Sequence, residues 1–227
     1  MVAGGVSTAA ALPGHVVSAL KIAGPVFFLG IQGSLVKTAI KINKEKSVGS
    51  LSIIPFLSLL ANCVIWGYYA ILKSDMTLLI PSAIGVLNAL FCIYAYDKNS
   101  SAVNKKTIYN LNTALLLLTT LLFHLKKSDM IGYLGVGISI ALMGSPLASL
   151  KGVLETKSTE SMPFATSLLS FLNAVSWLLY GKLVANDVLV YAPNVLGVGL
   201  TLFQLSLFFR FGIGSPDQKL SRQAKMM

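Results

Sequence analysis

An asparagine and a tryptophan stand four residues apart at two places in the chain. The pairs are Asn62 and Trp66 in "LLANCVIWGYYA" (59–70), and Asn173 and Trp177 in "SFLNAVSWLLYG" (170–181). Residues four apart lie on one face of a helix. An amide donates and accepts hydrogen bonds, as a rim of hydroxyl groups requires, and an aromatic ring packs against an apolar C–H face. A pyranose sugar offers both surfaces, so the pairs predict one sugar-sized site built from two parts of the chain.

The stretches that carry these pairs are apolar enough to lie in a membrane. Hydrophobic residues make up 55% of the chain, charged residues 11%, and the mean hydropathy is +0.75. A soluble domain carries about a quarter charged residues, and a membrane-spanning helix needs roughly 20 apolar residues. The chain provides several such runs, and we expect seven helices, the fourth being the shortest, at 17–40, 50–72, 77–96, 108–125, 131–150, 163–184 and 188–211.

Asparagines inside hydrocarbon need hydrogen-bond partners. An unpartnered amide there costs several kcal/mol, so Asn62, Asn173 and Asn194 should face a neighbouring helix or a water-filled cavity. A hydrogen bond between helices explains a single asparagine, but recurrence beside tryptophan favours a polar cavity. Tryptophans also gather in belts at the membrane surface. Tyr69 and Tyr180 lie nearer the helix ends and suit that role better.

The basic residues are distributed unevenly between the two sides of the predicted helices. With the N-terminus outside, five lie on the outer side: Lys21, Lys73, Lys126, Lys127 and Lys182. Thirteen lie on the inner side: Lys37, Lys41, Lys44, Lys46, Lys98, Lys105, Lys106, Lys151, Lys157, Arg210, Lys219, Arg222 and Lys225. This excess predicts an extracellular N-terminus and a cytoplasmic C-terminus. The net charge of +10 therefore orients the chain in the membrane, and we do not expect it to bind nucleic acid.

The chain contains a unit of three helices twice. The distance along the chain from Asn62 to Asn173, called here the repeat separation, also separates Trp66 from Trp177 and Ser47 from Ser158. A second set of matches is separated by one residue more, which implies a one-residue insertion between the halves: Asp75, Pro81 and Gly85 correspond to Asp187, Pro193 and Gly197. The first three helices therefore correspond to the last three, with the fourth as a connector. An odd connector makes the two units parallel, with a pseudo-twofold axis along the membrane normal.

The predicted fold class is thus an all-α membrane protein with seven transmembrane helices in a 3+1+3 arrangement. We expect five regions: an extracellular tail (1–16), the first three-helix repeat (17–96), the connector helix with its loops (97–130), the second repeat (131–211) and a basic cytoplasmic tail (212–227).

Two long paired motifs carry a resemblance to a known family. "KSVGSLSIIPFLSLLANCVIWGYYAILKSDMTLLIPSAIGV" (46–86) is similar to the first half of a SWEET sugar transporter. "TKSTESMPFATSLLSFLNAVSWLLYG" (156–181) and "NDVLVYAPNVLGV" (186–198) resemble its second half. SWEET transporters are a known case of parallel repeats. The resemblance implies a substrate pocket formed by Asn62, Trp66, Ser82, Asn173, Trp177 and Asn194. Family members typically carry asparagine at the position of Ser82.

The resemblance also implies hinges and a gate. Proline removes a backbone hydrogen bond and bends a helix, and Pro55, Pro146 and Pro163 match three of the family's four hinge prolines. The fourth position is Ile31, beside Gly30 and Gly33, which we expect to supply flexibility instead. An ordinary helix-end proline is the alternative at each position. A gate at the outer side would use Tyr69 and Asp187.

The mechanism is constrained by the acidic residues. No Asp or Glu lies in the middle of a predicted span, whereas ion-driven transporters usually carry such groups at membrane depth. The sequence also lacks a phosphate-binding loop of the Walker type. We therefore expect facilitated diffusion by alternating access, with no enzymatic activity, cofactor or metal. In the family, small residues at the positions of Asn62 and Asn173 accompany disaccharide transport, so the bulkier asparagines favour a hexose such as glucose.

Three other functions remain to be weighed. A seven-helix receptor has the right helix count, but a duplicated 3+1+3 pattern does not suit it. An intramembrane enzyme would need partners for His15 or His124, and the sequence offers none. PQ-loop relatives carry amino acids, but their Pro-Gln signature is broken here at Pro146-Leu147 and Ile31-Gln32. Besides sugar and membrane lipid, the resemblance implies homo-oligomers as partners, and we expect the plasma membrane as the location.

Overall fold

The structure is a computed structural model that describes residues 12–100 and 106–213. Within these residues the chain forms helices and connecting turns and no β-strand. Most of both predicted tails, together with Lys105, Lys219, Arg222 and Lys225, lies outside the described residues. The helices are α1 (Gly14–Glu45), α2 (Ile54–Lys73), α3 (Met76–Lys98), α4 (Lys106–His124), α5 (Ser128–Leu142), α6 (Gly144–Thr156), α7 (Phe164–Leu179), the π-helix η2 (Tyr180–Val184) and α8 (Val188–Phe211).

All seven predicted spans are helical, but the fifth is divided into α5 and α6. Pro146 cannot donate a backbone hydrogen bond to the carbonyl of Leu142, four residues earlier, and Leu142 is where α5 ends. Met143 makes a tighter turn instead, with its N–H 3.0 Å from the carbonyl oxygen of Ile140. Five helical segments are long and apolar enough to cross a membrane: α1, α2, α3, α7 with η2, and α8.

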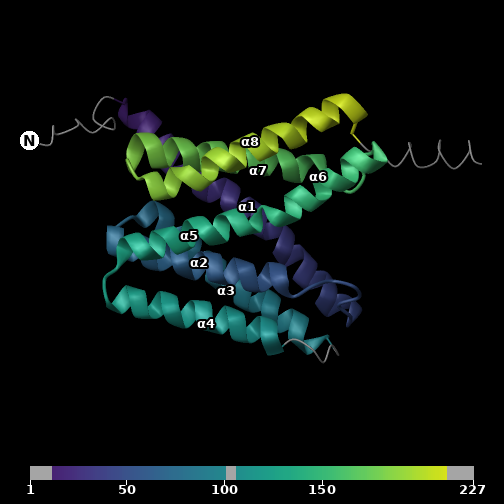
Figure 1. Cartoon of the computed structure of the whole chain (residues 1–227), viewed down its shortest axis with the longest axis horizontal. Helices are drawn as coiled ribbons and strands as arrows, with labels where there is room; N and C mark the ends of the chain where they lie inside the picture. Colours follow the sequence, from purple (N-terminus) through teal and green to yellow (C-terminus); the bar gives the residue numbers. More distant parts are fainter. Residues whose placement is uncertain (1–11, 101–105, 214–227) are drawn as a thin grey trace, which may run out of the picture.

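The two repeats have the same internal order. In the first, α3 packs between α1 and α2, and in the second, α8 packs between the α5–α6 segment and α7. The repeats meet twice, through α1 with α7 and through α2 with α5. These two contacts are equivalent under the repeat, because each joins the first helix of one unit to the second helix of the other. The structure therefore has the predicted pseudo-twofold arrangement (Figure 1).

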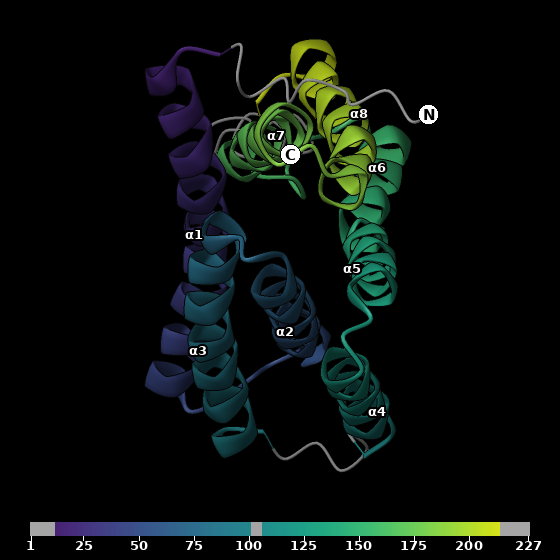
Figure 2. The ribbon, with the colours of Figure 1, turned by 90° about the vertical axis from the view of Figure 1, so that its left-hand side faces the viewer.

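The connector α4 breaks this symmetry. It packs against α2 and α5 on one side of the molecule (Figures 1 and 2). The Asn112 amide donates to the carbonyl oxygen of Leu57 over 3.0 Å, and the rings of Tyr68 and Phe123 stack with centroids 4.4 Å apart. These contacts fix the connector to the first repeat.

One extra residue in the second repeat is absorbed by the π-helix. Tyr69 and Tyr180 still have the repeat separation, whereas Asp75 and Asp187 are separated by one residue more. The π-helix η2 begins at Tyr180 and ends before Asp187. A π-turn holds one more residue than an α-turn. The one-residue insertion predicted from the repeat is therefore confirmed, and it leaves both aspartates in matching positions.

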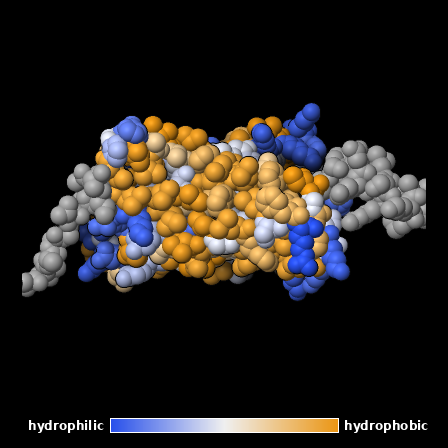
Figure 3. All heavy atoms as spheres, turned by 90° about the horizontal axis from the view of Figure 1, so that it is seen from above, coloured by the Kyte–Doolittle hydropathy of each residue, from blue (hydrophilic) through white to orange (hydrophobic). Residues whose placement is uncertain are grey.

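The molecule has two polar ends, which we distinguish by their acidic residues. Asp75, Asp129 and Asp187 lie at one end, called here the aspartate end, where each begins or precedes a helix. Asp75 and Asp187 cap α3 and α8, because their carboxylates accept hydrogen bonds from the N–H groups of the first turn. Between the ends the surface is an apolar band, as the membrane interior requires (Figure 3).

Apolar packing joins the repeats at the aspartate end and separates them at the other. One cluster there contains Ile65 and Tyr69 of the first repeat together with Ile131, Tyr180 and Val190 of the second. Toward the opposite end, each repeat has a cluster of its own: one includes Ile42, Phe56 and Tyr96, and the other includes Leu150, Val153 and Phe208. The bundle is thus closed across its aspartate end.

Candidate functional site

A cavity of about 120 Å³ lies between the repeats, and all six predicted pocket residues line it. One buried water needs a cavity volume of about 10–15 Å³, so this cavity can hold several waters or a small polar ligand. Its lining comes from the helices that make the contacts between repeats, and from α3 and α8: Asn62, Trp66, Ser82, Asn173, Trp177 and Asn194, with Phe28, Leu78, Pro81, Ser139 and Val190.

Each tryptophan is positioned by a glycine of the opposite repeat. A side-chain carbon at Gly135 would come within 2.9 Å of the Trp66 ring, and one at Gly24 within 2.9 Å of the Trp177 ring. Small residues allow helices to approach closely in membranes, where packing rather than water exclusion drives association. Gly24 and Gly135 themselves have the repeat separation. The repeat therefore places both rings against the other unit and beside the cavity.

Most polar groups of the first repeat bond to protein atoms, whereas the amide N–H groups of Asn62 have no partner among the described residues. The Trp66 indole N–H donates to Oγ of Ser139 over 3.2 Å, and the Ser139 hydroxyl lies 3.5 Å from Oδ1 of Asn62, which is a long, weak hydrogen bond. Ser82 donates its hydroxyl to the carbonyl oxygen of Leu78 over 2.7 Å.

The second repeat leaves more of its polar groups free. Asn194 donates one amide hydrogen to the carbonyl oxygen of Val190 over 2.8 Å, the counterpart of the Ser82 bond. Oδ1 of Asn173 is buried without a hydrogen-bond partner among the described residues. Within the same part of the chain, the Trp177 indole N–H also has no partner, although the ring lines the cavity. The Trp177 N–H can therefore donate to a hydroxyl of a ligand, whereas Oδ1 of Asn173 has almost no accessible surface in this conformation.

Two tyrosine–aspartate hydrogen bonds close the aspartate end beside this cavity. Tyr69 donates to Asp187 over 2.5 Å, so the two predicted gate residues are in contact. Tyr180 donates to both carboxylate oxygens of Asp75 over 2.8 Å. The repeat predicts this second pair, because Tyr180 and Asp75 are the counterparts of Tyr69 and Asp187, but the sequence reading missed it.

The expected surface role of the two tyrosines is wrong. Tyr69 and Tyr180 are 1% and 4% exposed, so neither can belong to an aromatic belt facing lipid headgroups. Each packs edge-on against the tryptophan of its own repeat, with centroids 5.5 Å and 5.7 Å apart. The gate and the cavity are therefore in direct contact.

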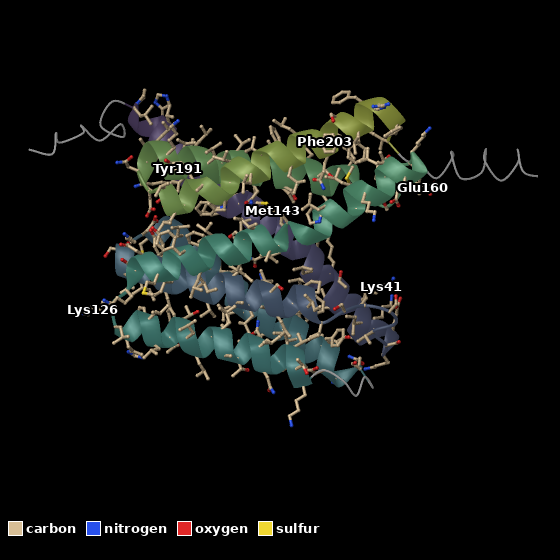
Figure 4. All side chains as sticks on the ribbon, in the orientation of Figure 1. Lys41, Lys126, Met143, Glu160, Tyr191 and Phe203 are labelled. Carbon is tan, nitrogen blue, oxygen red and sulfur yellow. The ribbon has the colours of Figure 1, made fainter. Side chains whose placement is uncertain are left out.

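The predicted hinge prolines do not line the cavity. Pro55 lies in the first turn of α2 and Pro163 precedes α7, so both begin helices instead of bending them. Pro146 lies in α6 just after the break at Met143, which is midway between the two ends of the molecule (Figure 4). In α1, Pro25 interrupts the backbone ladder, a position that the sequence reading did not consider. A hinge function for these prolines stays a prediction.

Five cavity residues were not predicted from the sequence, and for two of them the repeat carried a signal. Phe28 and Ser139 line the cavity and have the repeat separation, as the Asn–Trp pairs do. They differ in type, so a search for identical residues does not find them. No group of three or more His, Cys, Asp or Glu side chains that could bind a metal ion occurs in the part of the chain that the structure describes.

Comparison with known proteins bears on what this arrangement is for. A family model described as "Sugar efflux transporter for intercellular exchange" matches the chain twice, over residues 18–100 and 129–213. The chain belongs to the SWEET family. It is 32% identical to the rice (Oryza sativa subsp. indica) "Bidirectional sugar transporter SWEET15", over 84% of this chain and 65% of that protein. It is 30% identical to the Dictyostelium discoideum "Sugar transporter SWEET1", over 75% of this chain and 82% of that protein.

The fold resembles that of a solved SWEET structure. The structure of a eukaryotic SWEET transporter superposes with a TM-score of 0.78 at 28% identity, covering 87% of this chain and 97% of that chain. This similarity and the family match agree with the 3+1+3 fold predicted from the repeat. The chain spans 65% of the length of the rice relative.

Proposed function

We propose that this chain is a bidirectional facilitative sugar transporter that works by alternating access. The observation that carries the proposal is the cavity between the repeats, lined by two Asn–Trp pairs at equivalent positions. Each pair offers an aromatic ring for the C–H face of a sugar and an amide for its hydroxyls. The names of the SWEET relatives, which include "bidirectional sugar transporter", support the same function.

The packing supports a conformation that is closed at one end. The two Tyr–Asp bonds and the shared cluster join the repeats at the aspartate end, whereas the opposite end has a separate cluster in each repeat. Transport would then follow when the repeats rock, so that the aspartate end opens and the opposite end closes.

The charge distribution supports an extracellular aspartate end. Five basic residues lie toward that end, namely Lys21, Lys73, Lys126, Lys127 and Lys182. Nine described basic residues lie toward the opposite end: Lys37, Lys41, Lys44, Lys46, Lys98, Lys106, Lys151, Lys157 and Arg210. The positive-inside rule then places the N-terminus outside and the C-terminus in the cytoplasm. The conformation is in this case open to the cytoplasm, and the plasma membrane is the location we propose.

The acidic residues support passive transport. The described Asp and Glu residues all lie near helix ends: Glu45, Asp75, Asp97, Asp129, Glu155, Glu160 and Asp187. None of these is placed to carry a proton through the middle of the membrane. Family membership also argues against a receptor, an intramembrane enzyme or an amino-acid carrier of the PQ-loop type. We further propose a hexose as the substrate, since Asn62 and Asn173 narrow the cavity, and a homo-oligomer as the assembly.

Uptake into proteoliposomes tests this function. Radiolabelled glucose, fructose and sucrose are supplied separately to vesicles that contain the purified chain, and protein-free vesicles are the control. We expect saturable uptake of glucose that is faster than that of sucrose. Faster sucrose uptake would contradict the hexose preference, and the absence of uptake for all three sugars would contradict the proposed substrate class.

A further inference from the structure

One pair of equivalent cavity residues differs in chemical type between the two repeats. Phe28 of α1 and Ser139 of α5 occupy equivalent places, at the repeat separation, and both line the cavity. Each lies four residues after the glycine that supports a tryptophan of the opposite repeat, Gly24 or Gly135. One turn of helix therefore presents a hydroxyl to the Trp66 side of the cavity and an apolar ring to the Trp177 side.

Ser139 contacts both members of the first Asn–Trp pair, although the amide N–H groups of Asn62 have no partner among the described residues. The Ser139 oxygen accepts the Trp66 indole N–H over 3.2 Å, which is within the normal range for a hydrogen bond. Its hydroxyl hydrogen points to Oδ1 of Asn62 over the longer distance of 3.5 Å. An indole has one N–H group and no acceptor. Trp66 thus has no donor left for a ligand while this bond holds.

Phe28 cannot do the same for the second pair. A phenyl ring offers neither a donor nor an acceptor, so the Trp177 indole N–H stays without a partner among the described residues. Oδ1 of Asn173 is likewise buried and unpartnered within residues 12–100 and 106–213. The two pairs therefore differ in their indoles, because the N–H of Trp177 is free and that of Trp66 is bound to Ser139.

The third pair of cavity residues differs in the same direction. Ser82 gives its one hydrogen to its own helix, which leaves only its lone pairs for a ligand. Asn194 also gives one hydrogen to its helix, but its carbonyl oxygen and second amide hydrogen are left. In the Asn–Trp pairs and in the pair of Ser82 and Asn194, the second repeat has more groups that are free to form hydrogen bonds.

We propose that Ser139 is a positioning residue that orients the sugar in the cavity. By holding the indole N–H of Trp66, it leaves this tryptophan only its apolar ring for contact with the sugar. The sugar then binds with its hydroxyl edge toward Asn173, Trp177 and Asn194, and with a C–H face toward Trp66. The proposal rests on the proposed function for the identity of the ligand, but the bond between Ser139 and Trp66 does not.

The two indole N–H groups can be observed directly, since the chain has two tryptophans. The purified chain is labelled with ¹⁵N-tryptophan in detergent micelles, the two signals are assigned with Trp177→Phe, and D-glucose is the added ligand. Without sugar, we expect the Trp66 N–H to exchange with solvent at least about tenfold more slowly than that of Trp177. Ser139→Ala should abolish this protection, and Ser139→Thr, which keeps the hydroxyl, should retain it. Equal exchange rates in the unmodified chain would overturn the proposal.

Glucose titration then tests the orientation of the ligand. D-glucose should shift the Trp177 indole signal more than the Trp66 signal, and Trp177→Phe, which removes the free N–H, should weaken glucose binding by about five- to 150-fold. Trp66→Phe, which keeps an apolar ring, should weaken it less than about threefold in the unmodified chain. In the Ser139→Ala background, Trp66→Phe should weaken binding fivefold or more, because the Trp66 indole N–H is then free to bind the sugar. Equal losses for Trp66→Phe and Trp177→Phe in the unmodified chain would overturn the proposal.

A second variant covers the case in which Ser139→Ala does not fold. Phe28→Ser would give the Trp177 indole the same partner that Trp66 has. We expect glucose binding to weaken about fivefold or more, although the cavity becomes larger, and unchanged or tighter binding would contradict the proposal. If glucose neither shifts a signal nor crosses the membrane, the proposed function fails, while the exchange rates still decide whether Ser139 holds Trp66. If glucose is transported but shifts the Trp66 signal more, only the orientation is wrong.

Discussion

At the scale of single residues, similar side chains in the two repeats are left with different free groups. Ser82 and Asn194 both bond to the carbonyl four residues earlier in their own helices. A serine donates its single hydroxyl hydrogen to this bond, whereas an asparagine still has one amide hydrogen and its oxygen available for a ligand. The difference in residue type is therefore a difference in what each helix can offer a substrate.

The first prediction compares these two residues. Asn194→Ala should weaken sugar binding by about five- to 150-fold, since losing a partner in a buried site costs about 1–3 kcal/mol. Ser82→Ala should weaken binding less than fivefold, because the lost hydroxyl already bonds to its own helix. Ser82→Asn should tighten binding or leave it unchanged. Binding isotherms with D-glucose measure all three, and equal losses for the two alanine variants would refute the asymmetry.

The second prediction concerns the bonds that close the aspartate end. Tyr69→Phe removes the donor to Asp187, and hydrogen bonds to charged groups contribute about 1.5–3 kcal/mol. We expect the aspartate end to open about tenfold more often or more, and Tyr180→Phe should act in the same direction. The measurement is the rate at which a membrane-impermeant thiol reagent, supplied from that side, labels Ser82→Cys in a Cys63→Ala, Cys92→Ala background.

Tyr133→Phe is the matched control for the gate. Tyr133 lies on α5 near the same end but is 67% exposed, so its hydroxyl takes no part in the closure. In the Tyr133→Phe variant, the thiol reagent should label Ser82→Cys at the same rate as in the chain that keeps Tyr133. If Tyr69→Phe and Tyr180→Phe also leave the rate unchanged, the bonds do not hold the end closed.

Individual site residues can be predicted from the sequence when the same residue type occurs at equivalent positions of both repeats. Asn62, Trp66, Asn173 and Trp177 were predicted because the same pair recurs at one separation, and all four line the cavity. Phe28 and Ser139 were missed because a phenylalanine and a serine do not look like a match. The burial of Tyr69 and Tyr180 was missed because hydropathy and position along a helix do not reveal which neighbour covers a side chain.

At the scale of helices, the first helix of each repeat crosses from one unit to the other. Gly24 and Gly30 of α1 lie against Trp177 and Leu169 of α7, while Ala39 and Ile42 pack within the first repeat. Likewise, α5 lies against α2 of the first repeat, and α6 packs against α8 of its own. Figure 1 shows that α1 and the α5–α6 segment cross between the repeats. A motion of one repeat against the other therefore bends these two segments.

The two crossing segments differ at equivalent residues. Gly144 begins α6 directly after the break, and its counterpart at the repeat separation is Gly33, where α1 continues without interruption. Gln32, beside Gly33, accepts a hydrogen bond from the amide of Asn88 over 2.7 Å, which ties α1 to α3. This equivalence supports the prediction that α1 bends near Gly30 and Gly33.

The third prediction tests that hinge with one residue. A side-chain carbon at Gly33 would meet no atom within 4 Å, whereas one at Gly30 would lie 3.3 Å from Leu169, so Gly33→Ala stiffens the helix without a clash. Alanine favours helix over glycine by about 1 kcal/mol, and we expect glucose transport to slow about fivefold at an unchanged dissociation constant. Gly137→Ala, also in open space, should not slow it. Transport by Gly33→Ala at the parental rate would contradict the hinge, and Ile31→Pro should be tolerated.

The helices themselves were predictable, but the break in the fifth span was not. Hydropathy reports that residues 131–150 are apolar throughout, and Pro146 alone does not decide between a kink and a break. The π-helix after α7 was predictable only as an insertion, because the sequence does not say how the chain accommodates it. Both irregularities lie at points where the second repeat departs from the first.

At the scale of the whole molecule, the repeats form two units joined at one end around a polar cavity. The Tyr–Asp bonds and the shared apolar cluster lie on one side of the cavity, and the separate clusters lie on the other. The parallel repeats were predictable from the constant separation of the matched residues. The end at which the bundle is closed was not predictable, because the proposed transport cycle uses the same sequence in conformations closed at either end.

The central claim is that sugar moves passively in both directions, and counterflow tests it most directly. Proteoliposomes preloaded with unlabelled glucose receive labelled glucose outside, with and without a protonophore. The account predicts transient accumulation of label that decays to equilibrium, at the same rate in both conditions, because no described carboxylate lies at membrane depth. Sustained accumulation of glucose against its gradient that the protonophore abolishes would contradict it.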